Sequence, residues 1–513
     1  MAATRLRALA VLLAFTDPWG CSGGGARPPP AKTAMDSEDR GGIAPGAPVS
    51  TEGPSGEELA KPLDRARLAG WPSRLLVGRG TLPRDDREFL RRVAEDTWRG
   101  ISSFRDRQSG LPLDHVRFEG RSVAEADAHV GNYATTSSIG LHLIAIVAAR
   151  ELGFLSGAET EKMLRQVLET LQRLETHRGF CFNFYDITSL ERTSDFLSFV
   201  DSAWLTAGLM VVRMAVPRLS EVCTRHIAQL DLRFFYDESE RLMSHGYHVD
   251  RSARSPYHYG VLFTEARLGS LIAIGKGEAP GVHWLRLLET FPTGCTGEPA
   301  SPSDAGPSIL LDRAASRSCS TWRGLRFVPS WGGSMFEALM PTLVLDEMRL
   351  APETFGKNDE VHATVQRLYA LEELRLPVWG MSPSTAPSDR GYAYAEYGVP
   401  VLGRKGYPSG VVTPHAAALV LAVAPEAATL NLRKLVELYD VYGEFGFYDA
   451  VDPHSGEVVH AYLTLDQTMT LIALANHLEA GCIQKHFAAD PIVQAALPFL
   501  DEKHIDEHGS GAR

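Results

Sequence analysis

Helical periodicity is the feature of this sequence that most constrains its fold. From about residue 84 almost to the C-terminus, apolar residues recur three or four positions apart, or form nearly continuous apolar runs suited to inner helices. The predicted helices are Asp86–Phe104, Thr135–Leu152, Gly157–Thr176, Asp201–Val216, Tyr257–Gly275, Ser334–Met348, Asp359–Glu373, Pro414–Ala424, Ala427–Tyr439, Leu465–Ala480 and Pro491–Phe499. No βαβ alternation and no series of short alternating strands appears, which argues against an α/β sheet or a β-sandwich. The pattern therefore predicts an all-α fold.

Loops rich in glycine and aromatic residues separate the predicted helices. Residues 179–186 and 442–449 are two examples, and the Pro/Ser/Gly-rich stretch 292–320 is typical of a surface insertion. A series of helices joined by such loops fits a toroid of paired helices. We expect the loops at one end of this toroid to line a cleft.

The N-terminal segment has the pattern of an export signal. Arg5 and Arg7 precede an apolar run, and Cys21 follows it at the start of a Gly-rich stretch. This pattern favours a lipoprotein signal over residues 1–21 with lipidation at Cys21; an ordinary cleaved signal and a plain disordered terminus are the alternatives. Residues 22–80, rich in Gly and Pro, are expected to form a disordered tether before a domain at 81–505 and a disordered tail at 506–513. We therefore expect an exported protein, periplasmic or attached to the outer membrane only through a lipid.

Composition and missing motifs exclude several function classes. The net charge of −12 argues against nucleic acid as a partner, and no run of about 18 apolar residues suggests a spanning helix. The chain has no P-loop, no His-Glu-x-x-His and no Gly-x-Ser-x-Gly motif, and its cysteines are widely spaced, so we expect no cofactor and no metal. Cys295 and Cys319 could form a disulfide or remain buried thiols.

Carboxylates set among aromatic and small residues are the recurring chemical theme. In the segment Trp331–Pro341, Ser334 is a plausible N-cap and Glu337 stands where a capping box would place it. The alternative is that Glu337, flanked by aromatic residues, lines a sugar-binding cleft. Asp201 presents the same choice between a helix cap and a site residue.

Glu265 is a candidate for a general acid. On a predicted helix it shares a stripe with Val261 and His258, whereas Arg267 points elsewhere. A glutamate in apolar surroundings has a raised pKa, which suits a proton donor; a solvated glutamate is the alternative. Asp186, Asp449 and Asp466 each end an aromatic loop or begin a helix, and each could cap a turn or helix or belong to a site.

Glycosidases need two carboxyl groups, one that donates a proton and one that activates water or attacks the sugar, together with aromatic rings that stack on sugars.

Several segments carry a resemblance to a known family. They are, in order, Thr136–Leu141, Asn183–Asp186, Phe199–Leu205, Thr264–Leu268, Trp331–Pro341, Tyr397–Pro400 and Gly446–Ala450. Through them the chain, from about residue 86 to 505, resembles the glycoamylase-like family, which includes endo-β-1,2-glucanases and the central domain of cyclic β-1,2-glucan synthases. The resemblance implies an (α/α)6 barrel and activity on β-glucans, with Glu265 as the acid and Asp201 and Glu337 in the cleft. Synthase-like members have a nucleophilic glutamate where this chain has Pro383, which favours hydrolysis by inversion.

The sequence thus predicts a glycoside hydrolase that acts on a β-glucan or oligosaccharide, most directly β-1,2-glucan. Glu265 is the expected acid, and the base is expected among Asp201, Glu337 and Asp449. The expected sugar-binding residues are Trp204, Tyr185, Asp186, Tyr259, Trp331, Trp379, Tyr394 and Asp449. The alternatives are a glycan-binding envelope lipoprotein without catalysis and a retaining transglycosylase.

Overall fold

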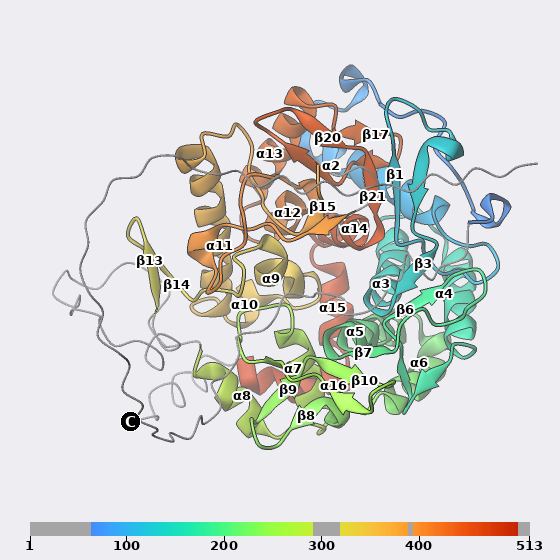
Figure 1. Ribbon diagram of the computed structural model, residues 1–513, viewed down its shortest axis with the longest axis vertical. Coiled ribbons are helices and arrows are strands. Elements are labelled where there is room, and N and C mark those ends of the chain that lie inside the picture. The colour runs from blue at the N-terminus through green and yellow to red at the C-terminus, as the bar shows by residue number, and fades with distance from the viewer. Residues whose placement is uncertain (1–62, 291–318, 388–392, 501–513) are drawn as a thin grey trace, which may run out of the picture. The chain divides into compact units, whose positions relative to one another are not determined.

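The computed structural model describes residues 63–290, 319–387 and 393–500, and this part of the chain is mostly helical, as predicted (Figure 1). Its α-helices are α2 (Asp86–Ser103), α3 (Thr136–Glu151), α4 (Gly157–Leu171), α5 (Phe199–Ala215), α6 (Ser220–Gln229), α7 (Arg267–Gly275), α8 (Gly281–Leu288), α9 (Met335–Leu339), α10 (Glu347–Leu350), α11 (Phe355–Leu368), α12 (Pro414–Leu419), α13 (Pro425–Leu438), α14 (Thr464–Leu478), α15 (Cys482–Ala488) and α16 (Pro491–Ala496). The long periodic segments thus form helices near their predicted positions.

The helices divide into an inner and an outer set. Helix α3 packs against α5 and α14, α5 packs against α7, and α12 packs against both α9 and α14. Almost every side chain of α3 is buried, whereas α2 and α4 have one buried and one exposed face. Figure 1 shows α4, α6, α8 and α11 toward the periphery of the molecule, outside these inner helices.

The aromatic loops form short antiparallel strands, which the sequence pattern did not reveal. The strands are β1 (His115–Phe118), β2 (Ala128–Val130), β3 (Tyr133–Thr135), β4 (Thr176–His177), β5 (Phe180–Cys181), β6 (Phe184–Asp186), β7 (Phe196–Ser198), β8 (Tyr236–Asp237), β9 (Leu242–Ser244), β10 (Gly246–His248), β11 (Ala253–Arg254), β12 (His258–Tyr259), β13 (Ser320–Trp322), β14 (Leu325–Phe327), β15 (Ser384–Thr385), β16 (Tyr394–Ala395), β17 (Tyr442–Gly443), β18 (Gly446–Phe447), β19 (Ala450–Asp452), β20 (Glu457–Val459) and β21 (Ala461–Leu463). They pair in sheets of two or three strands. Such strands are too short to show an alternating pattern, and they leave the prediction of a helical fold intact.

Two helix predictions needed correction, and three helices were missed. The segment Tyr257–Gly275 is helical only from Arg267, because β12 at its start pairs with β9 instead. The segment Ser334–Met348 is divided into α9, a 3-10 turn that contains Pro341, and α10. Helices α6, α8 and α15 were not predicted.

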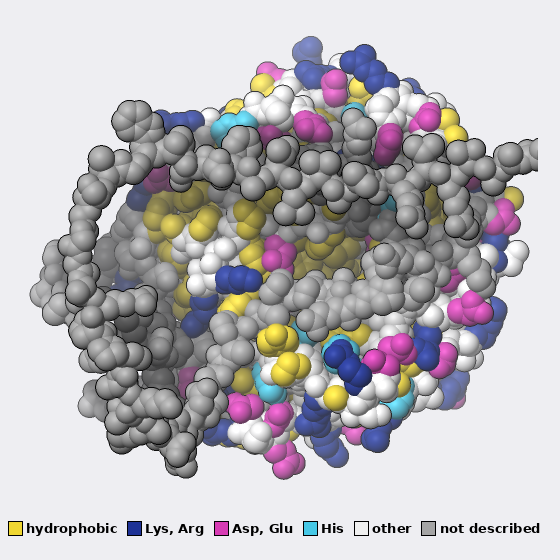
Figure 2. Space-filling view, viewed as in Figure 1, with side chains coloured by type: hydrophobic (Ala, Val, Ile, Leu, Met, Phe, Trp, Pro, Cys, Tyr) yellow, Lys and Arg dark blue, Asp and Glu magenta, His cyan; other side chains and the backbone are white. Residues whose placement is uncertain are grey.

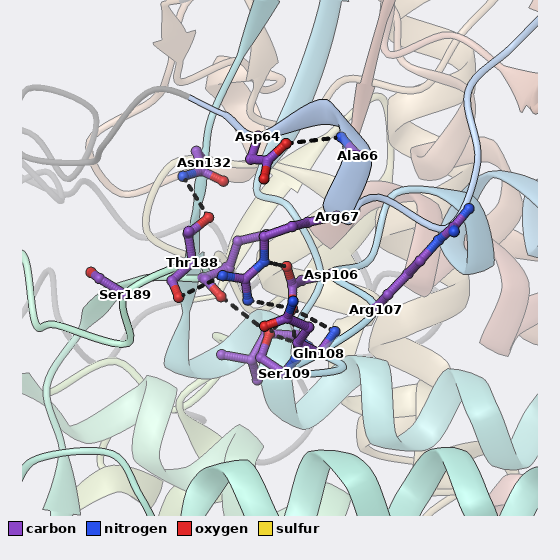
Figure 3. A network of polar contacts seen from close by, with 12 residues as sticks. Asp64, Ala66, Arg67, Asp106, Arg107, Gln108, Ser109, Asn132, Thr188 and Ser189 are labelled. Carbon is purple, nitrogen blue, oxygen red and sulfur yellow. Dashed lines mark hydrogen bonds and ion pairs between the residues drawn. The ribbon is translucent and has the colours of Figure 1, made fainter.

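The predicted disordered tether is wrong over residues 63–80, which pack against the helical domain. Leu68 is fully buried, and the Val77 amide donates to the Tyr442 carbonyl at 3.1 Å. Arg67 donates from Nε and Nη2 to the two carboxylate oxygens of Asp106, at 2.6 and 3.0 Å, and from Nη1 to the Thr188 carbonyl (Figure 3). The prediction of disorder rested on the Gly/Pro-rich composition of residues 22–80 as a whole, and composition does not identify the few residues that make these contacts.

We expect Arg67→Met to lower the free energy of unfolding by about 2 kcal/mol, because the Asp106 carboxylate, which is 1% exposed, loses its counterion. Urea denaturation measures the effect. Arg79→Met is the matched control, since its pair with Asp440 is exposed on both sides and should contribute less than about 0.5 kcal/mol. Equal effects of the two substitutions would contradict the anchoring role of Arg67.

Four predictions fall wholly or partly outside the described residues. They are the signal segment with Cys21, the tether before residue 63, the surface insertion at 292–320 with Cys295, and the C-terminal tail. Among the described residues, no helix is long and apolar enough to cross a membrane. Cys319 is disulfide-bonded, while Cys181, Cys223 and Cys482 are free and buried.

Candidate active site

Acidic side chains gather where the inner helices begin. Asp201 lies in the first turn of α5, Glu337 in the first turn of α9 and Asp466 in the first turn of α14. Glu265 lies in the turn just before α7. Helix N-termini carry partial positive charge, which favours carboxylates there. Figure 2 shows hydrophobic side chains in the middle of the visible face, with an acidic side chain among them and charged side chains around the rim.

Glu265 has the electrostatic properties of a proton donor. Burial raises the pKa of its carboxyl to about 8, and the charge of Glu337 adds to this effect. The neighbouring Arg267 does not neutralise Glu265, because its guanidinium binds the Glu347 carboxylate at 2.6 and 2.9 Å. Glu265 itself is half-buried, so a ligand can reach it. The raised pKa agrees with the first of the two alternatives that the sequence left open, a proton donor rather than a solvated glutamate, although Glu265 lies in a turn rather than on a helix.

Glu337 is held by the predicted capping box. The Ser334 hydroxyl accepts from the Glu337 amide at 3.2 Å, and the Glu337 carboxylate accepts from the Ser334 amide at 3.1 Å. The same carboxylate accepts from the Gly332 amide and from the Ser330 hydroxyl, at 2.9 Å each. Burial raises the pKa of Glu337, and these hydrogen bonds oppose the shift. Three donors fix this carboxylate in place, so Glu337 both caps its helix and lies near Glu265.

Asp201 is not the cap of its helix. Ser198 occupies the N-cap, and its hydroxyl accepts from the Asp201 amide at 3.3 Å. Among the described residues, no hydrogen bond holds the half-buried Asp201 carboxylate. Its charge contributes to the raised pKa of Glu265, after burial and Glu337, and to the raised pKa of Tyr259, after burial and Glu265. Asp201 and Glu265 therefore lie near each other.

The predicted aromatic residues fall into accessible and buried groups. Tyr259 and Trp331 are half-buried and Tyr394 is 44% exposed, so all three can contact a ligand. Trp204 and Trp379 are at most 4% exposed, which corrects their prediction as sugar-binding residues, because a ring enclosed in the core cannot stack on a sugar.

Tyr185 and Asp186 are also structural rather than sugar-binding. Tyr185 is fully buried, and its hydroxyl accepts from the Phe182 amide and donates to the Glu175 carbonyl. The Asp186 carboxylate accepts from the amides of Thr188 and Ser189, at 2.8 and 2.7 Å, and so caps a turn. The safer capping reading was therefore correct for Asp186.

Tyr407 and Glu396 were missed by sequence reasoning. Burial raises the pKa of the Tyr407 hydroxyl, and the charges of Glu337, Glu396 and Glu265 add to the shift, which places the hydroxyl among these acids. The Tyr407 ring lies against Gly332, where a Cβ would come within 2.0 Å of it, so this position requires glycine. No local motif marks Tyr407, because its partners are distant in sequence.

A second acidic cluster comprises Asp449, Asp466 and His415. The Thr385 amide donates to Asp449 Oδ2 at 2.7 Å, and His415 Nδ1 lies 2.9 Å from Asp466 Oδ2. Burial raises the pKa of Asp449, and the nearby Asp466 raises it further. Desolvation, followed by the charges of Asp466 and Asp449, also raises the pKa of Tyr394. Tyr394 therefore lies beside this cluster, and Asp449, predicted as a sugar-binding residue, is 2% exposed.

Comparisons with known proteins identify the fold class first. A putative glucoamylase from Bacteroides fragilis superposes with a TM-score of 0.64 at 18% identity, over 82% of this chain and 98% of that one. An endo-β-1,2-glucanase from Chitinophaga pinensis, solved with sophorotriose and glucose, gives 0.62 at 17% identity over 82% and 99%. An endo-β-1,2-glucanase from Talaromyces funiculosus, solved with sophorose, gives 0.62 at 12% identity over 84% and 92%. The chain therefore has the mostly helical fold of glucoamylase-like proteins.

Sequence comparisons then show which protein families the chain resembles. Residues 303–491 match the family described as "Putative glucoamylase", and residues 92–240 match a family described as "Protein of unknown function (DUF3131)". The cyclic β-(1,2)-glucan synthase NdvB of Rhizobium meliloti is 24% identical over 81% of this chain, which spans only 18% of that relative's length. The resemblance to the glycoamylase-like family is thus confirmed. Asp201 and Glu337 fall within the matched segments, and Glu265 falls between them.

Proposed function

We propose that this protein is a glycoside hydrolase that cleaves a β-glucan by inversion, with Glu265 as the general acid. The observation that carries the proposal is a half-buried glutamate that retains its proton at neutral pH, next to a second carboxylate and accessible aromatic rings. Such a glutamate can protonate the oxygen of a leaving sugar without help from a cofactor.

An (α/α)6 toroid is the proposed architecture of this site. Among the inner helices, α3 contacts α5, and α5 contacts α7. Helix α9 contacts α12, α12 contacts α14, and α14 contacts α3. Arg267 links α7 to α9 by donating to the Ala338 carbonyl at 2.7 Å. Because the site residues lie at the beginnings of these helices, closure of the ring would bring them together at one end.

β-1,2-Glucan is the proposed substrate. Two of the fold relatives are endo-β-1,2-glucanases solved with sophorotriose or sophorose, and the curated relative is a cyclic β-(1,2)-glucan synthase. Tyr259, Trp331 and Tyr394 supply accessible rings that suit the apolar faces of glucose units.

Asp201 is the carboxylate that best fits the role of the base. Glu337 is held by several hydrogen-bond donors, and Asp449 is buried beside another carboxylate, so neither is free to take up a proton from water. Asp201 is accessible and has no hydrogen-bond partner among the described residues. In the proposed step Asp201 accepts a proton from a water molecule whose oxygen bonds to the anomeric carbon. The glycosidic C–O bond breaks as Glu265 gives its proton to the leaving oxygen.

The segment around Pro383 supports hydrolysis over retaining transfer. Ser382 accepts from the amide of Phe336 in α9 at 3.2 Å, and Thr385 donates to Asp449 at 2.7 Å, so Pro383 lies between the two acidic clusters. By the family resemblance, a nucleophilic glutamate stands here in synthase-like members. Proline has no group that could attack a sugar, which favours water as the nucleophile.

We expect kcat/KM for β-1,2-glucan to fall as pH rises through about 8, by about tenfold for each further pH unit. The sign follows from the role of Glu265: a general acid acts in its protonated form, and that form is lost above its pKa. A pH–rate profile of the purified protein measures this alkaline limb. A profile that stays flat up to pH 10 would contradict the assignment of Glu265.

Product analysis with anomeric resolution tests the function as a whole. Incubation with linear β-1,2-glucan should release shorter oligosaccharides. NMR during the reaction should show their new reducing ends first as the α-anomer. Cyclic or elongated products with retained β-configuration would indicate a transglycosylase instead. Binding of the glucan without any product would indicate the non-catalytic alternative.

A further inference from the structure

Three buried side chains outside the proposed acid–base pair converge on one point. They are His415, Asp449 and Asp466, and each is 2% exposed. One nitrogen or oxygen atom from each residue lies within 4.8 Å of those of the other two. The residues come from α12, from the loop after β18 and from α14, so the tertiary fold brings them together.

Most polar atoms of this group have no hydrogen-bond partner outside the group among the described residues. They are both ring nitrogens of His415, Oδ1 of Asp449 and both carboxylate oxygens of Asp466, while within the group His415 Nδ1 lies 2.9 Å from Asp466 Oδ2. The remaining Asp449 oxygen is fixed by the Thr385 amide, which orients the carboxylate. Buried polar atoms without partners are rare, because each loses about 1–3 kcal/mol of solvation. Within residues 63–290, 319–387 and 393–500, no lysine or arginine forms an ion pair with either carboxylate. In the described part of the chain, the group therefore has ligand atoms that no residue outside it uses, and no cationic side chain beside its two carboxylates.

We infer that His415, Asp449 and Asp466 bind a divalent transition-metal cation. One imidazole and two carboxylates form a ligand set that suits Mn²⁺ or Zn²⁺, and three protein ligands leave a coordination position open. Mg²⁺ and Ca²⁺ fit less well, because they prefer oxygen ligands alone, whereas this group offers an imidazole nitrogen. The inference goes beyond the proposed function, since Glu265 and Asp201 need no metal for hydrolysis.

A proton shared between Asp449 and Asp466 is the competing explanation. It too would relieve the repulsion between the carboxylates, but it would leave His415 Nε2 without a partner among the described residues. The two explanations differ in stoichiometry and ligand identity, which binding measurements can resolve.

Metal binding to the full-length protein is the first test. The protein is stripped with a chelator and titrated calorimetrically with Mn²⁺ and Zn²⁺, with Mg²⁺ and Ca²⁺ as parallel arms. We expect one transition-metal ion per chain, and about 100-fold weaker binding by Asp466→Asn. Asp452→Asn is the matched control, because its carboxylate caps a nearby turn at His454 and Ser455 and is not in the group. Substoichiometric binding, or unchanged affinity in Asp466→Asn, would assign the site to a shared proton.

Anomalous diffraction from native crystals soaked in Mn²⁺ is a second measurement that needs no variant. We expect a peak among His415, Asp449 and Asp466, and a peak only elsewhere would overturn the inference. Neither experiment measures turnover, so its failure would leave the hydrolase proposal standing, and loss of hydrolase activity would leave the metal result intact.

Discussion

Replacing Glu265 with Gln is expected to lower kcat/KM on β-1,2-glucan by about 1,000-fold while the protein remains folded. The amide keeps the size of the side chain but cannot donate a proton to the leaving oxygen, and general acid catalysis typically contributes 10²–10⁴-fold. The half-buried position favours a neutral group, as the raised pKa of Glu265 indicates, so the neutral amide should not destabilise the turn. Release of reducing ends measures turnover, and circular dichroism checks the fold.

Two controls separate proton donation from general disruption of the site. Glu240→Gln, an exposed glutamate between β8 and β9, should leave turnover unchanged. A glucosyl fluoride substrate carries a leaving group that needs no protonation, so Glu265→Gln should retain much of its turnover on it. Asp201→Asn should fail on both substrates, because attack by water still requires the base. Near-normal hydrolysis of the glucan by Glu265→Gln would refute the assignment.

Sequence reasoning succeeded where the determining contacts are local. The capping box of Ser334 and Glu337 involves residues three apart, and the turn at Asp186 is closed by the next few amides. Inner helix α3 was predicted because a nearly continuous apolar run of this length is typical of a helix that is buried on all sides. The raised pKa of Glu265 was one of two alternatives that its neighbours along the chain left open, and burial in the fold together with the charge of Glu337 decides between them.

The errors arose where distant contacts decide the outcome. Apolar residues before α7 look helical, yet His258 and Tyr259 pair with β9. Trp204 was placed in the cleft by its motif, but α5 turns this side chain into the core, since a motif does not say which face of a helix is buried. The group of His415, Asp449 and Asp466 has no sequence spacing that would mark it, because three separate elements supply its members.

Arg267→Met is expected to lower the free energy of unfolding by about 4 kcal/mol. Arg267 is 1% exposed, and its guanidinium binds Glu347, which is equally buried, at 2.6 and 2.9 Å. Asp359, fully buried, lies 3.7 Å from the same guanidinium. Removing the cation leaves buried acids without compensation, and breaking such a pair typically costs 3–5 kcal/mol. Urea denaturation measures the loss, with Arg349→Met as the matched control. The pair of Arg349 with Asp346 is largely exposed and should contribute less than about 0.5 kcal/mol.

Arg267 also connects the two elements that carry Glu265 and Glu337. Its Nη1 donates to the Thr264 carbonyl at 3.0 Å, one residue before the proposed acid, and to the Glu337 carbonyl at 3.3 Å. Arg267→Lys keeps the charge that Glu347 requires but cannot reach all of these carbonyls, because an ammonium lacks the planar fork of a guanidinium. We therefore expect Arg267→Lys to be more stable than Arg267→Met and yet to show reduced kcat/KM and a shifted alkaline limb. Full activity in folded Arg267→Lys would mean that the turn before α7 keeps its geometry without this link.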